Sequence, residues 1–220
     1  MRDGKKISPA VIKRLPMYYR YLKDLIEKGI HRISSKELAE RMGITASQMR
    51  QDLNNFGCFG QQGYGYNVEV LYEEIVNIMG LDRPHTVILI GAGKFGQVLV
   101  NYPNFKDKGF NFIAVFDKDP TLIGTEVNGI EIIDVKFLEV FLRENTVDIV
   151  ALAVPGSAAN KLVLTLAKHD IKGIWNFSQN DLSLPENIIV EDVRLSDSLM
   201  TLSYKMHEKE VLSRAVRDFW

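Results

Sequence analysis

The sequence predicts an α/β protein with an N-terminal winged helix-turn-helix domain and a C-terminal Rossmann-like domain built on a doubly wound parallel sheet. Amphipathic helical segments with capping residues fill the first 80 residues, whereas β-branched strands alternate with helices after Pro84. The first of these strands ends in a glycine-rich turn of the dinucleotide-binding type. We therefore expect a winged-helix domain at 1–80, a nucleotide-fold domain at 81–195 and a terminal helix at 196–220.

Composition excludes several classes of protein. The single cysteine, Cys58, rules out a disulfide framework and a multi-cysteine metal site, and the four histidines are scattered singly, so we predict no metal site. No apolar run approaches the roughly 18 residues that a membrane-spanning helix needs. The N-terminus is too charged and aromatic for a signal peptide, so we expect a cytoplasmic protein with no membrane partner.

Charge is distributed unevenly along the chain. Residues 1–60 contain twelve Lys and Arg against six Asp and Glu, a net charge of +6, so the remainder carries −7 within a total of −1. A basic segment joined to an acidic domain indicates that the N-terminal part meets a polyanion such as nucleic acid. An ordinary solvated surface is the alternative explanation.

The first predicted helix runs from 9 to 28. Ser8-Pro9 gives an N-cap followed by proline at the first helical position, and Gly29 lies where a C-terminal glycine belongs. The apolar residues that fall on one face, and must pack against another element, are Ile12, Leu15, Tyr19, Leu22, Leu25 and Ile26.

Two short helices follow and form a helix-turn-helix. Ser34 with Glu37, and Thr45 with Gln48, each make a capping-box pattern, and Gly43 between them permits a left-handed turn. The second helix leaves outward-facing residues of the types that hydrogen-bond base edges and phosphates in a major groove: Ser47, Gln48, Arg50, Gln51 and Asn54. A solvated face in a small helical subdomain is the alternative.

The next segment suits a β-hairpin wing. Residues 57–66 are rich in glycine and aromatic residues, and Asn67 then caps a helix that ends at Gly80. This layout is that of a winged helix, in which Gln61 and Gln62 on the wing would contact DNA. Cys58 lies at the wing base, where we expect an ordinary structural cysteine rather than a redox thiol.

A glycine-rich turn opens the second domain. Residues 87–90 form a buried-strand pattern, and Gly91, Gly93 and Gly96 then satisfy G-x-G-x-x-G as the chain enters a helix. The first glycine permits the tight turn, the second lets a pyrophosphate approach the backbone, and the third lets helix and strand pack closely. The helix N-terminus offers N–H groups to phosphates. A tight turn with nothing bound is the alternative.

The second strand strengthens the nucleotide interpretation. Residues 112–116 end in Asp117, near the position about 20 residues onward where a ribose-binding acid is expected. Asp117 favours NAD over NADP, although the neighbouring Lys118 weakens that choice.

Further strands and helices alternate, which predicts a parallel sheet with right-handed crossovers. We expect strands at 86–90, 112–116, 130–133, 148–154, 173–177 and 188–191, and helices at 94–101, 135–144 and 158–169. Ligands bind such sheets at the carboxyl ends of the strands. The predicted cofactor-binding residues are Gly91, Ala92, Gly93, Lys94, Phe95, Gly96, Tyr102, Asp117, Lys118, Val154, Pro155, Asn176 and Phe177.

The terminal helix carries apolar residues that no later element can cover: Leu199, Leu202, Met206, Leu212 and Val216. It would pack back on its own domain or insert into a second subunit. We favour a homodimer, because DNA-binding proteins of this size normally double their contacts across a two-fold axis.

The sequence offers little for catalysis. It contains no Tyr-x-x-x-Lys pair at the right place, and no histidine lies beside a carboxylate in a predicted strand-end loop. We therefore predict no catalytic residues and no enzyme activity. A small oxidoreductase with a helical appendage is the alternative.

Motifs along nearly the whole chain fit one family: Ser8-Pro9, Arg20, Ser34-Ser35, 48–53, 57–66, 91–96, Tyr102-Pro103, Asp117, Val154-Pro155, 172–174, Asn176-Phe177 and 202–204. Together they resemble the bacterial redox-sensing transcriptional repressors called Rex. The resemblance implies a homodimer whose last helix is exchanged between subunits. It also implies binding to an inverted-repeat operator in double-stranded DNA when the protein is free or NAD-bound, and release when NADH replaces NAD, which derepresses fermentation and respiration genes.

Three positions depart from the family's usual pattern. Gln51 stands where the family commonly has lysine, and Gln62 where its wing often has arginine. Both changes remove phosphate contacts. We therefore expect operator binding to depend less on salt concentration, or the preferred operator sequence to differ. Arg194 stands where the family often has an acid that would pair with Arg20 across the dimer, so closure would use other residues, such as Asp192 or Asp197.

We interpret the response to NADH as a population shift between two dimer arrangements. An apolar pocket near Tyr102, Val154, Pro155 and Phe177 would prefer the neutral reduced nicotinamide ring to the charged oxidised one. Closure would move the two recognition helices away from the roughly 34 to 36 Å spacing, or a multiple, that successive major grooves require. A second alternative keeps this design but senses coenzyme A or another nucleotide.

Overall fold

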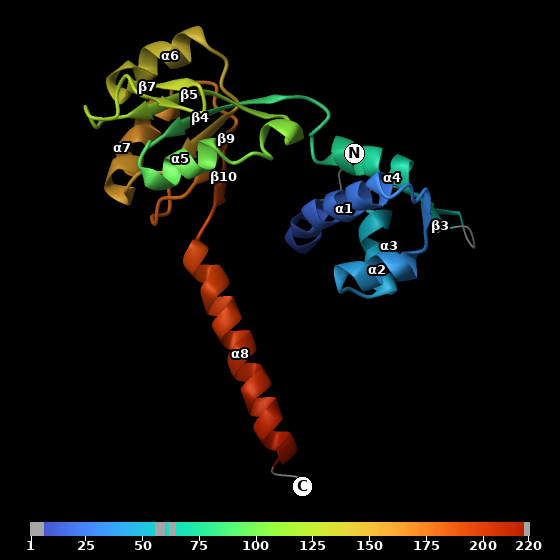
Figure 1. Ribbon diagram of the computed structural model, residues 1–220. Helices are drawn as coiled ribbons and strands as arrows, with labels where there is room; N and C mark the ends of the chain where they lie inside the picture. Colours follow the sequence, from blue (N-terminus) through green and yellow to red (C-terminus); the bar gives the residue numbers. More distant parts are fainter. Residues whose placement is uncertain (1–6, 56–59, 62–64, 218–220) are drawn as a thin grey trace. The chain divides into compact units, whose positions relative to one another are not determined.

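The computed structural model describes residues 7–55, 60–61 and 65–217. The chain divides into two compact units, one up to Arg83 and one from Pro84 onward (Figure 1). None of the helices in these described ranges is long and apolar enough to cross a membrane.

The N-terminal unit is a winged helix. Its elements are α1 (Pro9–Glu27), β1 (Arg32–Ile33), α2 (Ser35–Met42), α3 (Ala46–Asn54), β2 (Gly60–Gln61), β3 (Gly65–Asn67) and α4 (Val68–Ile78). The three short strands form an antiparallel sheet in the order β1, β3, β2. The predicted helix-turn-helix and the paired wing strands are therefore present, whereas Cys58 and Gln62 lie outside the described residues.

Side-chain caps begin the helices of this unit. Ser34 and Glu37 complete the predicted capping box at α2, and Asn67 Oδ1 accepts a hydrogen bond from the Val70 N–H at the start of α4. Gly43 ends α2 with a φ of +66°, the left-handed conformation expected there. These local signals explain why the helix boundaries agree closely with the prediction.

The capping box predicted at α3 forms only in part. Thr45 Oγ1 accepts a hydrogen bond from the Gln48 N–H at 3.1 Å, which is the first half of the motif. The side chain of Gln48 does not return to the Thr45 backbone; its Nε2 donates instead to Asp52 Oδ1 at 2.9 Å. In a complete box Gln48 Oε1 would accept from the Thr45 N–H. The bond that Gln48 donates to the ionised Asp52 is favoured instead, because hydrogen bonds to charged groups are stronger.

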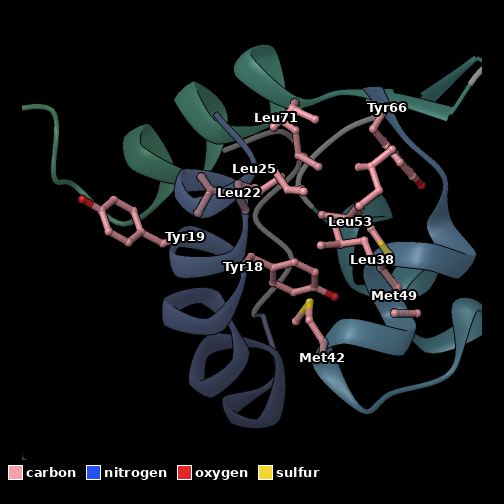
Figure 2. Packing of buried hydrophobic residues seen from close by; sticks show 14 of the residues in the cluster. Tyr18, Tyr19, Leu22, Leu25, Leu38, Met42, Met49, Leu53, Tyr66 and Leu71 are labelled. Carbon is pink, nitrogen blue, oxygen red and sulfur yellow. The ribbon is translucent and has the colours of Figure 1, made fainter. Parts of the chain in front are cut away.

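The core of this unit is built around α1. Figure 2 shows Tyr18, Leu22 and Leu25 of α1 directed at buried residues from α2, α3 and α4. The predicted apolar face of this helix is wrong at Ile12, which is 51% exposed. The residues that are buried on the helix are Val11, Leu15, Tyr18, Tyr19, Leu22 and Leu25. The buried stripe is thus rotated toward Val11 and Tyr18.

The second unit contains a seven-stranded sheet with the strand order β10, β9, β8, β4, β5, β7, β6. Its strands are β4 (His85–Ile90), β5 (Phe110–Asp117), β6 (Glu126–Val127), β7 (Ile130–Asp134), β8 (Ile149–Leu152), β9 (Gly173–Asn176) and β10 (Ile189–Asp192). All pairs are parallel except β6 with β7. The six predicted strands are confirmed, and the short β6 is the strand that the sequence analysis missed.

Helices cover the sheet on both faces. They are α5 (Lys94–Val100), α6 (Leu138–Glu144) and α7 (Gly156–Leu166). Ile88 and Ile90 of β4 pack in a core with α6 and α7, whereas Val87 and Leu89 pack on the other face with α5. Alternation of side chains along a strand accounts for this division.

The last helix, α8 (Leu195–Arg217), differs from the others because it contributes nothing to these cores. Every side chain described on it, from Leu195 to Ser213, is exposed. Its exposed apolar residues include Leu199, Met200, Leu202, Tyr204, Met206, Val211 and Leu212. A helix with this composition requires a further surface to cover it.

Candidate functional site

The first candidate site lies at the carboxyl end of β4, where the strand order reverses. β5 lies on one side of β4 and β8 on the other. The Gly91 N–H donates to the Phe116 carbonyl at 2.8 Å, and the Ala153 N–H donates to the Ile90 carbonyl at 2.9 Å, so the three strand ends are tied together. This is the topological switch point at which doubly wound sheets bind ligands.

Two of the three glycines in the turn are required by the fold. Gly91 has a φ of +105°, and a Cβ there would lie 2.5 Å from the Ala153 carbonyl oxygen. A Cβ on Gly96 would overlap the carbonyl oxygen of Gly91, because α5 passes directly over the turn. Both roles agree with those predicted from the glycine spacing.

Gly93 is different. Its φ is −62°, which any residue adopts, and nothing lies within 4 Å of the position that a Cβ would take. Neither the backbone nor the packing of this chain requires glycine there. The open space beside Gly93, immediately before α5, therefore fits a pyrophosphate that must approach the backbone closely.

Asp117 lies beside this turn, as a ribose-binding acid would. Its Oδ2 accepts a hydrogen bond from the Ala92 N–H at 2.5 Å, and its Oδ1 accepts from the N–H groups of Lys118 and Asp119 at 2.7 and 2.9 Å. The carboxylate thereby holds the end of β5 against the glycine turn. Lys94 and Lys118 are both exposed, at the start of α5 and just after β5.

Aromatic rings form a row on the face of the sheet that α5 covers. Phe95 contacts Phe177 with ring centroids 5.1 Å apart, Phe177 contacts Trp175 at 4.4 Å, and Trp175 contacts Phe105 at 5.4 Å. Tyr102, which is 51% exposed, continues the row at 5.0 Å from Phe105. The prediction included Phe95, Tyr102 and Phe177 but missed Trp175 and Phe105. Trp175 lies two residues before Phe177, a spacing that places both on one face.

The loop after β8 adjoins the glycine turn at the carboxyl ends of the strands. Doubly wound sheets bind nucleotides at this place, which we call the nucleotide crevice. Val154 Cγ1 would lie 2.9 Å from a Cβ on Gly91, so the predicted pair Val154-Pro155 adjoins the glycine turn. Gly156, the first residue of α7, is covered by the side-chain amide of Asn180, which a Cβ on Gly156 would overlap. Asn180 is thus a crevice residue that sequence reasoning missed. Its position just after β9, at the carboxyl edge of the sheet, was the available signal.

The side chain of Asn176 is turned into the protein. Its side chain is fully buried, and its Nδ2 donates to Asp192 Oδ1 at 2.6 Å and to the Asn180 carbonyl at 3.1 Å. Its Oδ1 accepts hydrogen bonds from the N–H and hydroxyl of Ser178. Both hydrogens and both lone pairs of the amide are therefore occupied within the protein. The side chain of Asn176 thus organises this loop, and the cofactor contact predicted at Asn176 stays a prediction.

The second candidate site is the exposed surface of α3. Ser47, Arg50, Gln51 and Asn54 are exposed there, as predicted, and Gln48 is half-buried against Asp52. Arg50 Nη1 donates to Ser35 Oγ at 3.1 Å, which joins α3 to the first turn of α2. Gln61 is part of β2, and the predicted contact at Gln62 lies outside the described residues.

A buried ion pair holds α3 against α1. Asp52 on α3 is fully buried; Arg14 donates to it at 2.6 Å from Nε and 2.8 Å from Nη2, and the Tyr18 hydroxyl donates at 3.0 Å. Burial alone would raise the pKa of Asp52, but the hydrogen bonds from Arg14, Gln48 and Tyr18 lower it below its usual value. Sequence reasoning missed this pair. An acid three residues after the apolar Met49, on the buried face of the helix, was the available signal.

Family models match both parts of the chain. The family model described as "Putative DNA-binding protein N-terminus" matches residues 6–54, and the model described as "CoA binding domain" matches residues 82–180. The chain is 54% identical to the "Redox-sensing transcriptional repressor Rex" of Clostridium botulinum (strain Hall), covering 96% of this chain and 100% of that protein. It is 52% identical to the protein of the same name from Clostridioides difficile (strain 630), covering 94% and 99%.

Solved structures agree with these relatives. RSP, described as a Rex-family repressor, superposes with a TM-score of 0.88 at 46% identity, covering 96% of this chain and 99% of that chain. RSP in complex with NAD⁺ and operator DNA gives a TM-score of 0.88 at 48% identity, covering 96% and 97%. RSP in complex with NADH gives 0.86 at 45% identity, covering 96% and 99%.

The relatives that match along nearly the whole chain are transcriptional repressors and not enzymes, which removes the support for the oxidoreductase alternative. The DNA-binding model matches within the first structural unit, and the CoA-binding model covers residues 82–180, nearly all of them in the second. With more than half of its residues identical over essentially the full length of the relatives, the chain belongs to the Rex family of redox-sensing transcriptional repressors.

Proposed function

We propose that this protein binds an inverted-repeat operator in double-stranded DNA as a homodimer and leaves it when NADH occupies the crevice of the second unit. One observation carries the nucleotide part of the proposal: Gly93 is a glycine that neither conformation nor packing requires, placed where a pyrophosphate must approach. The complexes of RSP with NAD⁺ and operator DNA, and with NADH, support the same pair of ligands here.

In this proposal the glycine turn with Ala92, Lys94, Asp117 and Lys118 holds the pyrophosphate and ribose. The exposed rings of Phe95 and Tyr102, together with Phe177 and the Val154-Pro155 segment, meet the nicotinamide. An apolar, aromatic surface favours the uncharged reduced ring, because placing the charged oxidised ring there costs hydration free energy. NADH is then the ligand that shifts the population toward the form released from DNA.

The DNA-binding surface in this proposal is α3 with the wing. Exposed polar side chains of α3 enter the major groove, while the wing lies along the adjacent backbone. The contact residues are Ser47, Gln48, Arg50, Gln51, Asn54, Gln61 and Gln62.

The dimer of this proposal covers α8. Its apolar side chains are spread around the helix and all those described are exposed, which is the pattern of a helix buried between other elements. The second unit also has an apolar hollow of about 290 Å³ whose lining includes Phe105, Phe112, Ile149, Trp175 and Ile189. Exchange of residues 196–220 between two subunits would cover such surfaces. We place the dimer in the cytoplasm, where it meets both DNA and the NADH pool.

Coenzyme A is a second candidate for the crevice. The family model that matches residues 82–180 is described as a CoA binding domain, and CoA also presents a pyrophosphate to a glycine turn. It lacks the nicotinamide ring that the aromatic row would contact. The aromatic row therefore favours NADH over CoA.

A gel-shift assay with and without nucleotide tests the proposal. A palindromic duplex is expected to bind much more tightly than a duplex with one half-site, and NADH is expected to release it while NAD⁺ and CoA are not. Release by CoA and not by NADH would establish the second candidate. Equal binding to both duplexes would reject the dimeric operator complex.

Substituting Arg50 with alanine is expected to weaken operator binding by about tenfold or more, because a base or phosphate contact from arginine is worth about 1–3 kcal/mol. NADH affinity is expected to stay unchanged, since Arg50 lies in the other unit. The measurement is a gel-shift titration together with a fluorescence titration of the nucleotide. Arg143→Ala, which removes an exposed arginine from α6, is the matched control. Unchanged operator affinity in Arg50→Ala would remove α3 from the interface.

A further inference from the structure

Residues 178–181 connect the nucleotide crevice to the start of α8. On the crevice side, the Asn180 side chain stands against Gly156 at the beginning of α7, directly after Val154-Pro155. A nucleotide that reaches the carboxyl end of β8 therefore meets Asn180. This contact links the crevice to the loop after β9.

The same loop is bound to the segment that leads into α8. Asn176 Nδ2 divides its two hydrogens between the Asn180 carbonyl at 3.1 Å and Asp192 Oδ1 at 2.6 Å. The Val193 N–H donates to the Asn176 carbonyl at 2.8 Å, and Arg194 forms an ion pair with Asp181. Asp192 is the last residue of β10, and α8 begins three residues later at Leu195.

The connection is rigid because its centre is buried and fully paired. Asn176 is 0% exposed and Ser178 5% exposed, and Ser178 donates to Asn176 Oδ1 from its N–H at 3.0 Å and its hydroxyl at 2.7 Å. No donor or acceptor of the Asn176 amide is left to accommodate a new arrangement. Movement of the Asn180 carbonyl therefore changes the hydrogen bond that the same amide makes to Asp192.

We propose that Asp192 is a positioning residue that transmits occupancy of the crevice to the base of α8 through Asn176. This inference rests on the proposed release by NADH and names the contact through which that release acts. A bound nucleotide moves Asn180, the Asn176 amide follows, and the bond to Asp192 sets where α8 starts. Asp192 does not touch the nucleotide; it contributes to the coupling free energy between the two ligands.

Three variants test the role of Asp192. Asp192→Ala removes the acceptor, whereas Asp192→Asn keeps a carbonyl oxygen that can accept from Asn176 Nδ2. Glu186→Ala is the matched control, because it removes an exposed acid from the same segment and Glu186 makes none of these hydrogen bonds. For each variant, operator affinity is measured with and without saturating NADH, and NADH affinity is measured without DNA by intrinsic tryptophan fluorescence.

In the wild type, NADH is expected to lower operator affinity. The ratio of operator affinity without NADH to operator affinity with NADH measures the coupling. In Asp192→Ala this ratio is expected to shrink by about fivefold or more, the lower end of typical coupling between sites. The operator affinity of Asp192→Ala without NADH, and its NADH affinity without DNA, are each expected to stay within about twofold of the wild type. Asp192→Asn and Glu186→Ala are expected to keep the wild-type ratio. A merely structural role would change stability but not this ratio. Should Asp192→Ala fail to fold, Ser178→Ala, which removes a hydrogen bond to the same amide, is expected to give the same reduction.

Each other outcome is decisive. A wild-type ratio in Asp192→Ala overturns the inference and leaves the proposed function standing, because the wild type still responds. Loss of NADH binding by Asp192→Ala without DNA overturns it too, since Asp192 would then belong to the binding site. Absence of release in the wild type rejects the proposed function, and the inference with it.

Discussion

Replacing Gly93 with valine is expected to abolish the response to NADH while the protein stays folded and still binds its operator. The side chain fills the open space beside the turn and holds a pyrophosphate away from the N–H groups at the start of α5. Hydrogen bonds to a charged group are worth about 1.5–3 kcal/mol, so losing one or two lowers nucleotide affinity by about a hundredfold. Fluorescence titration with NADH measures this loss.

Gly91→Val and Gly96→Val provide the contrast. Both place a side chain against backbone oxygens, and at Gly91 the φ of +105° adds strain, so both are expected to unfold the second unit. Thermal unfolding of the three variants distinguishes a glycine kept for a ligand from glycines kept for the fold. NADH binding by Gly93→Val at wild-type affinity would contradict the assignment of the turn.

Substituting Asp52 with alanine is expected to destabilise the N-terminal unit by about 3–5 kcal/mol and to abolish operator binding. Removal of the carboxylate leaves Arg14, Tyr18 and Gln48 without their shared acceptor in a buried place. Because the Arg14 side chain is 21% exposed, water compensates in part, and we expect the lower end of that range. NADH binding by the second unit is expected to persist.

Denaturant unfolding of Asp52→Ala, followed by operator gel shifts, measures both effects. Asp24→Ala is the matched control, because the Asp24 side chain is 41% exposed and pairs with Lys28 and Arg41 at the surface of the same unit, and such pairs contribute about 0–1 kcal/mol. If Asp52→Ala and Asp24→Ala had equal stability, the buried pair would not hold α3 in place.

The same pair gives the N-terminal unit a pH dependence of known sign. The folded state lowers the pKa of Asp52, so the carboxylate stabilises the fold at pH values above its unfolded pKa. That contribution is lost as the pH falls below about 4 and through the folded pKa. Asp52→Ala is expected to lack this part of the acid destabilisation when unfolding is measured across that range.

Much of this molecule follows from short stretches of sequence. Ser34 with Glu37, Asn67 and Gly43 set helix ends through contacts within a few residues, and the structure has each as expected. The strand positions and the roles of Gly91 and Gly96 were predictable as well, because a strand followed by a glycine turn and a helix is specified by adjacent residues. The polar surface of α3 follows from helical periodicity alone.

Other features depend on residues far apart in the chain, and local patterns do not specify them. Periodicity allows a broad apolar stripe on α1. Packing against α2, α3 and α4 buries Tyr18, while Ile12 stays exposed. The hydrogen bond from Gln48 to Asp52 replaced half of an expected capping box because Arg14, 38 residues earlier, holds the carboxylate there.

The residues of the nucleotide crevice show the same division. The sequence by itself determined which loops reach the carboxyl edge of the sheet, because strand ends and glycine turns are local properties. Only the tertiary structure decided that Asn176 is turned inward, that Asn180 covers Gly156, and that Trp175 and Phe105 join the aromatic row. The physical reason is that burial and hydrogen-bond partners are set by which strands pair and which loops meet, and those neighbours are distant in sequence.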